Sequence, residues 1–222
     1  METKYQVVAL IGKAGAGKDS IQKATCEAHP LMFHPIVSCT TRPKRGGEVE
    51  GIDYHFISLN DFTRKVLNGD MLEATEFRDW FYGTTLDSLV KDKINIGVFN
   101  PAGVEALLED SRLNVAVFEV NAPDKQRLMR YLNREEMPDC AEMCRRYFTD
   151  EKDFSDLDFD RYQIDNWDGG DLDLLTPNQS VVYLFEEMWR ELDTNTEFET
   201  IVRWESSMSK KAESDKDKDN NE

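Results

Sequence analysis

Residues 7–20 read V-V-A-L-I-G-K-A-G-A-G-K-D-S, and this stretch decides the fold. The apolar run at 7–11 has the length and branched content of a buried strand, and it stops at Gly12. Gly12, Gly15 and Gly17 follow within one turn, and Lys18 opens a helical pattern. The sequence therefore predicts a strand, a glycine-rich loop and a helix, in that order.

This order is typical of a phosphate-binding loop. Glycine backbone lets successive N–H groups converge on phosphate oxygens, and the helix N-terminus adds its positive dipole there. Lys18 supplies a mobile charge for the β- and γ-phosphates. The ATP-binding residues expected from the run are Gly12, Lys13, Ala14, Gly15, Ala16, Gly17, Lys18, Asp19 and Ser20.

One position departs from the pattern G-x-x-x-x-G-K-[ST], which has a hydroxyl for Mg²⁺ after the lysine. Here Asp19 follows the lysine and Ser20 comes next. A carboxylate also binds Mg²⁺, directly or through water. Asp19 is therefore the candidate metal residue, with Mg²⁺ the expected cofactor.

The composition limits the class of protein. With 222 residues and 40% hydrophobic content, the chain can bury a full core as one domain with a small insertion. The net charge of -17 argues against general binding of nucleic acid or anionic membranes. The absence of a membrane-length apolar run, of a signal-like N-terminus and of paired C-x-x-C spacing predicts a cytoplasmic protein with reduced thiols. No oligomeric state is predicted.

Apolar strands alternate with helical patterns along the chain. Strands are expected at 35–38, 54–57, 71–77, 80–84, 94–99, 115–120 and 162–164. Helices are expected at 19–28, 59–67 (capped by Asn60 or Asp61), 85–93, 102–109, 123–134, from about 140 to 153, and 179–192. The alternation predicts an α/β fold, a parallel sheet with helices on both faces. Residues 39–53 are expected to form a solvated loop.

A second motif lies at residues 38–56, S-C-T-T-R-P-K-R-G-G-E-V-E-G-I-D-Y-H-F. It resembles the guanylate kinase family, whose pattern is S-x-T-T-R-x-P-R-x-G-E-x-x-G-x-D-Y-x-F. M-L-E-A at 71–74 resembles that family's F-L-E-x-A, and Y-G-T at 82–84 resembles its Y-G-[ST]. Order and spacing agree over roughly residues 5–165.

The resemblance implies a P-loop nucleoside monophosphate kinase fold, with a parallel sheet flanked by helices, a GMP-binding insertion and a helical lid. The implied kinase domain is 1–205, with a core at about 5–37 and 94–195, the acceptor-binding insertion at about 38–93 and the lid at about 134–153. Residues 206–222, rich in Lys and Asp, form a tail that is expected to be disordered.

The resemblance also implies transfer of the γ-phosphoryl group of ATP to GMP or dGMP. The acceptor's phosphate would be bound by arginines, which pair bidentately with phosphate oxygens, and by tyrosine hydroxyls. The base would be read by a carboxylate that accepts from N1–H and the 2-amino group of guanine, and by hydroxyls at its O6 edge. The phosphate set is Arg42, Arg45, Tyr54 and Tyr82, and the base set is Glu73, Ser38 and Thr84.

Catalysis of phosphoryl transfer depends on positioning and on cations placed at the transferring group. Lys18 is the first candidate, and Arg42 is a further one. The resemblance adds two lid arginines, Arg134 and Arg146, with Arg130 and Arg145 as adjacent candidates. The alternative for each lid arginine is ordinary helix-surface charge.

The chain departs from the family after the strand at 94–99. There the family has D-[IV]-D-x-Q-G, and the matching residues are Val98, Asn100 and Ala102. The missing carboxylate suggests that acidic support for the metal has moved to Asp19. Asn100 is retained as an acceptor-site residue that could relax selectivity.

Two other functions stay open. The G-K-D loop resembles that of some viral deoxynucleoside monophosphate kinases, which favours a broader-specificity nucleotide kinase. Guanylate kinase-like domains can also be non-catalytic binding modules, but those typically lack a working phosphate loop, whereas Gly12, Gly17 and Lys18 are present here.

Overall fold

The computed structural model describes residues 4–77, 79–134 and 137–166, apart from the side chains of Phe77 and Arg134. The predictions for 179–192 and for the tail from residue 206 lie outside the described residues. Within the described ranges, no helix is long and apolar enough to cross a membrane.

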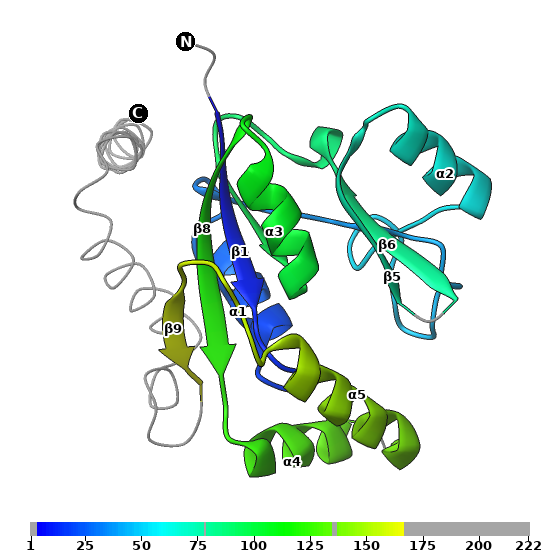
Figure 1. Ribbon diagram of the computed structural model, residues 1–222, viewed down its shortest axis with the longest axis vertical. Helices are drawn as coiled ribbons and strands as arrows, with labels where there is room; N and C mark the ends of the chain where they lie inside the picture. Colours follow the sequence, from blue (N-terminus) through cyan, green and yellow to red (C-terminus); the bar gives the residue numbers. More distant parts are fainter. Residues whose placement is uncertain (1–3, 78, 135–136, 167–222) are drawn as a thin grey trace, which may run out of the picture.

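The centre of the fold is a five-stranded sheet in the order β2-β7-β1-β8-β9 (Figure 1). Every neighbouring pair is parallel. This confirms the parallel sheet that the alternation of strands and helices predicted. The strands are β1 (Tyr5–Ile11), β2 (Phe33–Pro35), β7 (Ile94–Val98), β8 (Leu113–Asn121) and β9 (Tyr162–Asp165).

Helices cover both faces of this sheet, because β1 is apolar on both sides. Val8 and Leu10 pack in one core cluster with Ile21 of helix α1 (Lys18–Ala28). The intervening residues of β1 pack in a second cluster with Val104 and Leu107 of helix α3 (Pro101–Glu109). Successive side chains of a strand point to opposite faces, so one short strand holds two helices in place.

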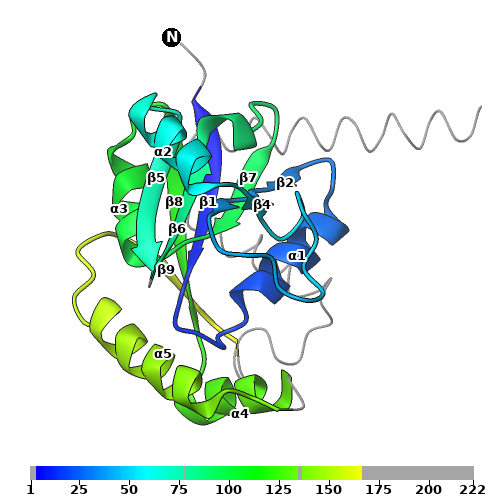
Figure 2. The ribbon, with the colours of Figure 1, turned by 90° about the vertical axis from the view of Figure 1, so that its right-hand side faces the viewer.

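Two further helices lie at the carboxyl-terminal end of β1 and β8 (Figures 1 and 2). They are α4 (Asp124–Arg134) and α5 (Cys140–Asp153). The predicted break between two helices in this region is confirmed. Figure 2 shows α5 passing across this end of the molecule, below the strands.

All of the second sheet lies between β2 and β7 in the sequence. Its order is β4-β3-β6-β5, and it carries helix α2 (Leu59–Leu67). It stands beside the main sheet (Figure 1), so the chain leaves the core after β2 and returns at β7. Its strands are β3 (Cys39–Thr40), β4 (His55–Phe56), β5 (Met71–Phe77) and β6 (Trp80–Thr85).

Four local predictions are corrected. The strand expected at 35–38 is β2, which begins earlier and ends at Pro35, an edge position where proline is tolerated. One further backbone bond, from the N–H of Ile36 to the carbonyl of Ile96 at 2.8 Å, follows it. Cys39 and Thr40 form β3 at the start of the expected loop, and both are buried. The cap of α2 is Ser58, whose side chain accepts from the backbone N–H of Asp61, so neither Asn60 nor Asp61 caps it.

The fourth correction concerns residues 85–93, where only Leu86–Ser88 form a short 3₁₀ turn. The buried side chain of Asn95 explains this. Its oxygen accepts from the N–H of Val90 at 2.8 Å, and its nitrogen donates to the Val90 carbonyl at 2.9 Å. These two bonds replace the backbone partners that a helix would give Val90.

Candidate functional site

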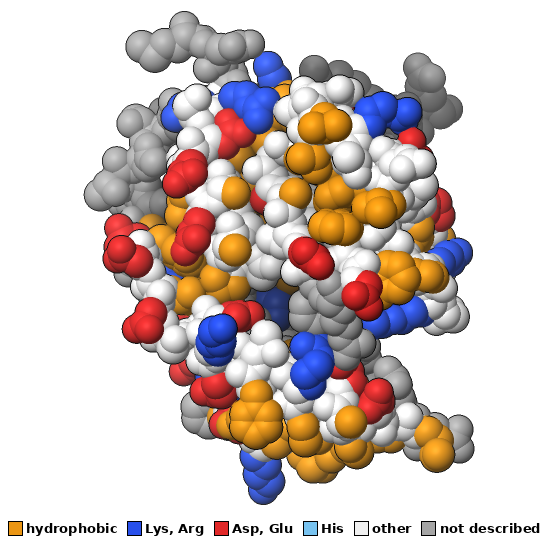
Figure 3. Space-filling model, turned by 45° about the vertical axis from the view of Figure 1, so that its right-hand side comes forward, with side chains coloured by type: hydrophobic (Ala, Val, Ile, Leu, Met, Phe, Trp, Pro, Cys, Tyr) orange, Lys and Arg blue, Asp and Glu red, His pale blue; other side chains and the backbone are white. Residues whose placement is uncertain are grey.

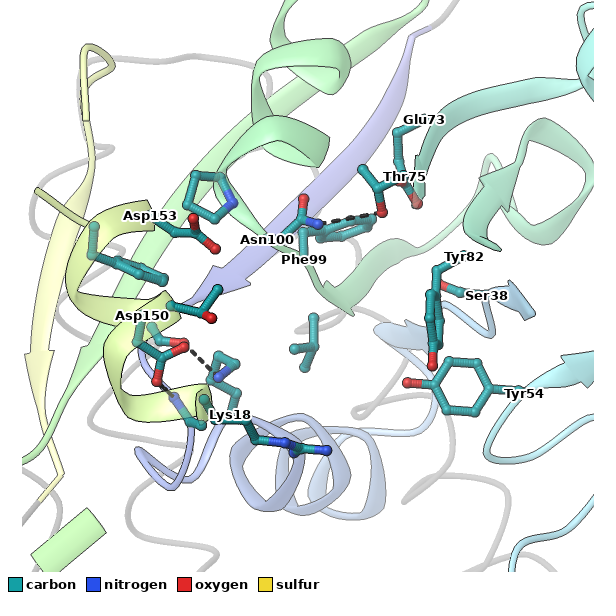
Figure 4. Close-up of a pocket in the computed structure, with 17 residues that line it drawn as sticks. Lys18, Ser38, Tyr54, Glu73, Thr75, Tyr82, Phe99, Asn100, Asp150 and Asp153 are labelled. Carbon is teal, nitrogen blue, oxygen red and sulfur yellow. Dashed lines mark hydrogen bonds between the residues drawn. The ribbon is translucent and has the colours of Figure 1, made fainter. Parts of the chain in front are cut away.

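A cavity of about 340 Å³ lies where β1 and β7 end. Four parts of the chain line it: the glycine loop (residues 12–17) with the start of α1, the second sheet, the segment that joins β7 to α3, and α5. Figure 3 shows a hollow with Lys or Arg atoms inside it and acidic side chains near its rim. In Figure 4, Lys18 and Asp150 stand at one end, and Glu73, Tyr54 and Tyr82 at the other.

The glycine loop requires glycine at several positions, among them Gly12 and Gly17. Gly12 has a φ of 143°, and a Cβ there would lie 2.3 Å from the carbonyl oxygen of Val120. Gly17, the residue before α1, has a φ of 102°, and a Cβ there would lie 2.3 Å from Nδ2 of Asn166. Both glycines let the backbone pass through conformations and gaps that a side chain would block. The predicted order of strand, loop and helix is present.

Lys18 reaches back over this loop. Its Nζ donates to the carbonyl of Gly12 at 2.6 Å and to that of Lys13 at 3.3 Å. Burial lowers the pKa of Lys18, while the carboxylates of Asp19 and Asp150 oppose that shift. The ammonium therefore lies in a poorly hydrated place that favours a ligand bringing negative charge.

Two arginines of α4 donate hydrogen bonds to backbone carbonyls of the glycine loop. Arg127 is 3% exposed and donates from Nε to the carbonyl of Ala14 at 2.9 Å. Arg130 donates from Nη1 to the carbonyls of Gly15 and Ala16, both at 3.2 Å. Arg127 was not predicted as a site residue, and Arg130 was predicted only as a candidate next to the lid arginines. Their spacing of three residues, which puts both on one face of a helix, is the signal that could have found the pair.

Acidic residues of α5, which were not predicted as site residues, contact the same loop. Asp150 and Asp153 line the cavity. Asp150 Oδ2 accepts from the N–H of Ala14 at 2.6 Å and from Arg127 Nη2 at 2.9 Å. Glu151 pairs with Lys13 of the loop.

The arginines that were expected to belong to a lid differ in placement. Arg146 lines the cavity, with its Nε 2.8 Å from Glu142 Oε1. Arg145 also pairs with Glu142, at 2.8 Å. The side chain of Arg134 is outside the described residues.

Glu73 stands at the other end of the cavity, on β5, directly opposite Thr84 of β6. Burial raises the pKa of Glu73 to about 7, and hydrogen bonds from the hydroxyl and backbone of Thr84 partly offset this effect. Thr84 is itself fully buried, and its Oγ1 lies 2.9 Å from Oγ of Ser38, which does line the cavity. Thr84 thus reaches the cavity only through its two neighbours.

The direction of this hydrogen-bond chain follows from proton counting. An ionised carboxylate only accepts, and a threonine hydroxyl has one proton to give. When Glu73 is ionised, Thr84 donates to it, and the proton between Ser38 and Thr84 comes from Ser38. Ser38 then presents lone pairs to the cavity until its hydroxyl rotates.

Tyr54 and Tyr82 line the cavity next to Ser38, whereas Arg42 and Arg45, the arginines predicted to bind the acceptor's phosphate, do not line it. Arg42 is 7% exposed, with its guanidinium 5.6 Å from the ring centroid of Tyr54. It forms a bidentate pair with Glu48 at 2.7 and 3.0 Å, and the hydrogen bonds to Glu48 raise the pKa of Arg42. Glu48 was absent from the predicted site.

Arg45 is exposed, and its backbone N–H donates to Oε2 of Glu48 at 2.7 Å. Glu48 therefore binds both the side chain of Arg42 and the backbone of Arg45. The sequence signal for this residue was its place in the G-E step of the motif at 38–56.

Asn100 follows β7 and lines the cavity together with Val98. Its Oδ1 accepts from the N–H of Gly103 at 2.7 Å, which caps α3, and its Nδ2 donates to Oγ1 of Thr75 at 3.3 Å. Thr75, two residues after Glu73, was not predicted as a site residue. Figure 4 shows this bond beside Glu73.

Asp19, the candidate metal residue, lies in the first turn of α1 and is not among the residues that line the cavity. Its charge still opposes the lowering of the Lys18 pKa that burial causes. Among the residues that the structure describes, no three His, Cys, Asp or Glu side chains gather as a ready-made metal site.

Comparisons with known proteins agree with this geometry. The family model described as guanylate kinase matches residues 4–168. A guanylate kinase of Latilactobacillus sakei is 37% identical over 86 residues, covering 39% of this chain and 42% of the relative. A guanylate kinase of Frankia casuarinae is 38% identical over 103 residues, covering 46% of this chain and 52% of the relative. The chain thus spans about half the length of the curated relatives that it matches.

A solved structure gives a wider match at lower identity. The guanylate kinase of Anaplasma phagocytophilum aligns with a TM-score of 0.58 over 86% of this chain and 88% of that protein, at 19% identity. Similarity at this level of identity supports the fold, and the family is carried by the match over residues 4–168.

Proposed function

Because this chain belongs to the guanylate kinase family, we propose that it transfers the γ-phosphoryl group of ATP to GMP or dGMP. The observation that carries the proposal is the cavity itself. It joins a glycine loop and a lysine at one end to a buried carboxylate at the other. A kinase needs this arrangement, because both phosphate groups must meet in line in a space that excludes water.

ATP is expected to bind along the glycine loop. The loop's N–H groups and the start of α1 would hold the phosphates, and Lys18 would leave its loop carbonyls for the β- and γ-phosphate oxygens. In the transition state, Lys18 and Arg146 would neutralise the charge that spreads over the transferring group. Arg134, at the end of α4, stays a candidate for the same task.

GMP is expected to bind with its base against Glu73. The ionised carboxylate would accept from N1–H and the 2-amino group, and adenine offers no such pair of donors. Ser38 would rotate its hydroxyl proton away from Thr84 to donate to O6. Thr84 would act through Glu73 and Ser38, because it is buried behind both.

The acceptor's phosphate would lie near Tyr54 and Tyr82, which line the cavity. Arg42 is adjacent to Tyr54 but is paired with Glu48. We propose that the phosphate draws Arg42 and Arg45 toward the cavity by competing with Glu48. The competition is reasonable because phosphate, like carboxylate, accepts two parallel guanidinium hydrogen bonds.

Mg²⁺ in kinase sites binds through one or two carboxylates together with the phosphates of the substrate. Asp19, in the first turn of α1, and Asp153, at the cavity wall, have the oxygen chemistry that this ion prefers. We propose that Asp19 holds the hydrated ion. The ion would supply charge neutralisation on the phosphates, while the residues of the chain orient them.

A coupled assay with ATP and each of GMP, dGMP, AMP, CMP and dTMP tests the proposal. We expect kcat/KM for GMP and dGMP to be at least about a hundredfold above that for the other acceptors. With those acceptors the buried Glu73 carboxylate would lack the two donors that guanine provides. Comparable rates with several acceptors would favour a broad nucleotide kinase. No turnover of any acceptor would favour a binding module.

A further inference from the structure

The glycine loop already carries an anion that belongs to the chain itself. Asp150 of α5 accepts a hydrogen bond from the N–H of Ala14 at 2.6 Å. Backbone N–H groups of such loops are the groups that hold phosphate oxygens. A carboxylate oxygen with a short, charge-assisted bond to this N–H therefore takes the place that a phosphate oxygen would take.

The contact lies at a definite point of the loop. Ala14 lines the same cavity as Tyr54, Tyr82 and Glu73, whereas the β-phosphate is expected nearer the helix start at Lys18. The group to be transferred must lie between the two ends of the cavity. Asp150 therefore occupies the γ-phosphate end of the loop.

The surroundings of Asp150 reinforce its role as an internal anion. The same oxygen accepts from Nη2 of Arg127 at 2.9 Å, and its charge opposes the lowering of the pKa of Lys18. Beside it, Glu151 pairs with Lys13. These contacts occupy the N–H of Ala14, the guanidinium of Arg127 and the ammonium of Lys13 with carboxylates of the chain itself.

Displacing this anion is structurally feasible. None of the fourteen residues of α5, all of which the structure describes, is buried. The helix contacts the loop and α4 through polar groups, including Tyr147 on Asp124 at 2.6 Å. A helix with no buried side chain can shift without opening a hydrophobic core.

We propose that Asp150 is a determinant of phosphoryl-donor affinity: it competes with the γ-phosphate for Ala14 of the glycine loop, and the nucleotide binds by displacing it. The inference rests on the proposed function, since it assumes that a nucleoside triphosphate binds at this loop. It predicts that the negative charge of Asp150 weakens triphosphate binding.

The test is the affinity of Asp150→Asn for a non-hydrolysable ATP analogue and for ADP, both with Mg²⁺, measured by calorimetry. Asparagine keeps a carbonyl oxygen for Ala14 and Arg127 but removes the charge, so the loop should stay intact. We expect the analogue to bind about tenfold more tightly, equivalent to about 1.4 kcal/mol, and ADP to gain less. Asp158→Asn, which removes one charge from an exposed residue beyond the end of α5, should change neither affinity.

Unchanged or weaker binding of the analogue to Asp150→Asn would overturn the inference, as would an equal gain for ADP or the same gain in Asp158→Asn. If neither nucleotide binds the unmodified protein, the proposed function fails instead.

A second measurement needs no variant. In the unmodified protein, the Ala14 amide proton should show the downfield NMR shift of a short bond to a carboxylate, and the analogue should change that shift; an unshifted Ala14 amide would contradict the contact.

Discussion

The hydroxyl oxygens of Ser38 and Thr84 lie 2.9 Å apart although the two residues are 46 positions apart in the sequence. The bond links the start of the second sheet to the residue that faces Glu73 across β5 and β6. Thr84 also donates to the Glu73 carboxylate, which lowers a pKa that burial has raised. The base reading that we propose for Glu73 therefore depends on Thr84, a residue that does not line the cavity.

Removing the Thr84 hydroxyl should move the pH dependence of acceptor binding. In Thr84→Val, Glu73 loses a hydrogen bond that favours its ionised form, so its pKa should rise further. We expect the KM for GMP at pH 7 to increase several-fold. The fall in KM that accompanies ionisation of Glu73 should occur at a higher pH than in the unmodified protein. Steady-state kinetics between pH 6 and 9 measure this shift. Thr84→Ser, which keeps the hydroxyl, should behave like the unmodified protein, and an identical pH profile in Thr84→Val would contradict the link.

Replacing the carboxylate itself should separate the two substrates. In Glu73→Gln, one of the two acceptors for guanine is replaced by an amide donor, so kcat/KM for GMP should fall by about a hundredfold or more. The affinity for ATP, measured by calorimetry, should stay within about twofold, because Glu73 lies at the other end of the cavity. Glu76→Gln, on an exposed position of the same strand, is the matched control. Equal losses for both substrates would exclude Glu73 as the base reader.

The same substitution should stabilise the fold at high pH. The pKa of Glu73 is about 7 in the folded protein and 4.5 ordinarily, so its ionisation costs free energy as the pH rises from about 4.5 to about 7. Below that range the Glu73 carboxyl is protonated in both the folded and the unfolded protein, so the cost is absent. We therefore expect the unfolding free energy of Glu73→Gln to exceed that of the unmodified protein by up to about 3 kcal/mol at pH 8 and by little at pH 4.5. Urea unfolding at both pH values measures this, and a difference independent of pH would refute the buried, ionisable state of Glu73.

Removing the charge of Lys18 should affect chemistry more than folding. In Lys18→Met, the phosphates lose their cation, and we expect kcat to fall by about 10²- to 10³-fold. The thermal midpoint should not fall, because burial already makes the ammonium costly, as its lowered pKa indicates. Lys23→Met, on the exposed side of the same helix, should retain full activity. Retained activity in Lys18→Met would remove Lys18 from the mechanism.

Adding one methyl group to the glycine loop should destabilise the fold. In Gly12→Ala, the new Cβ would meet the Val120 carbonyl oxygen at 2.3 Å, and the backbone would stay at a φ of 143°. We expect a loss of stability on the order of 3 kcal/mol. Gly46→Ala, where nothing lies within 4 Å, should change stability by less than about 0.5 kcal/mol. Thermal unfolding of both variants measures the difference. Similar midpoints would show that the fold does not depend on the close approach of Gly12 to the Val120 carbonyl.

The sequence by itself determined the strand, glycine loop and helix at residues 5–28, the parallel sheet and the motif that points to Glu73. These features depend on local properties, such as branched apolar runs, glycine conformation and residue spacing, which the linear chain carries. The tertiary structure alone decided the rest. It paired Arg42 with Glu48, placed Asp150 on Ala14, buried Thr84 behind Glu73 and used Asn95 to prevent a helix at 85–93. Ion pairs and buried hydrogen bonds join residues that are distant in sequence, so their partners are settled only when the packed elements bring the side chains together.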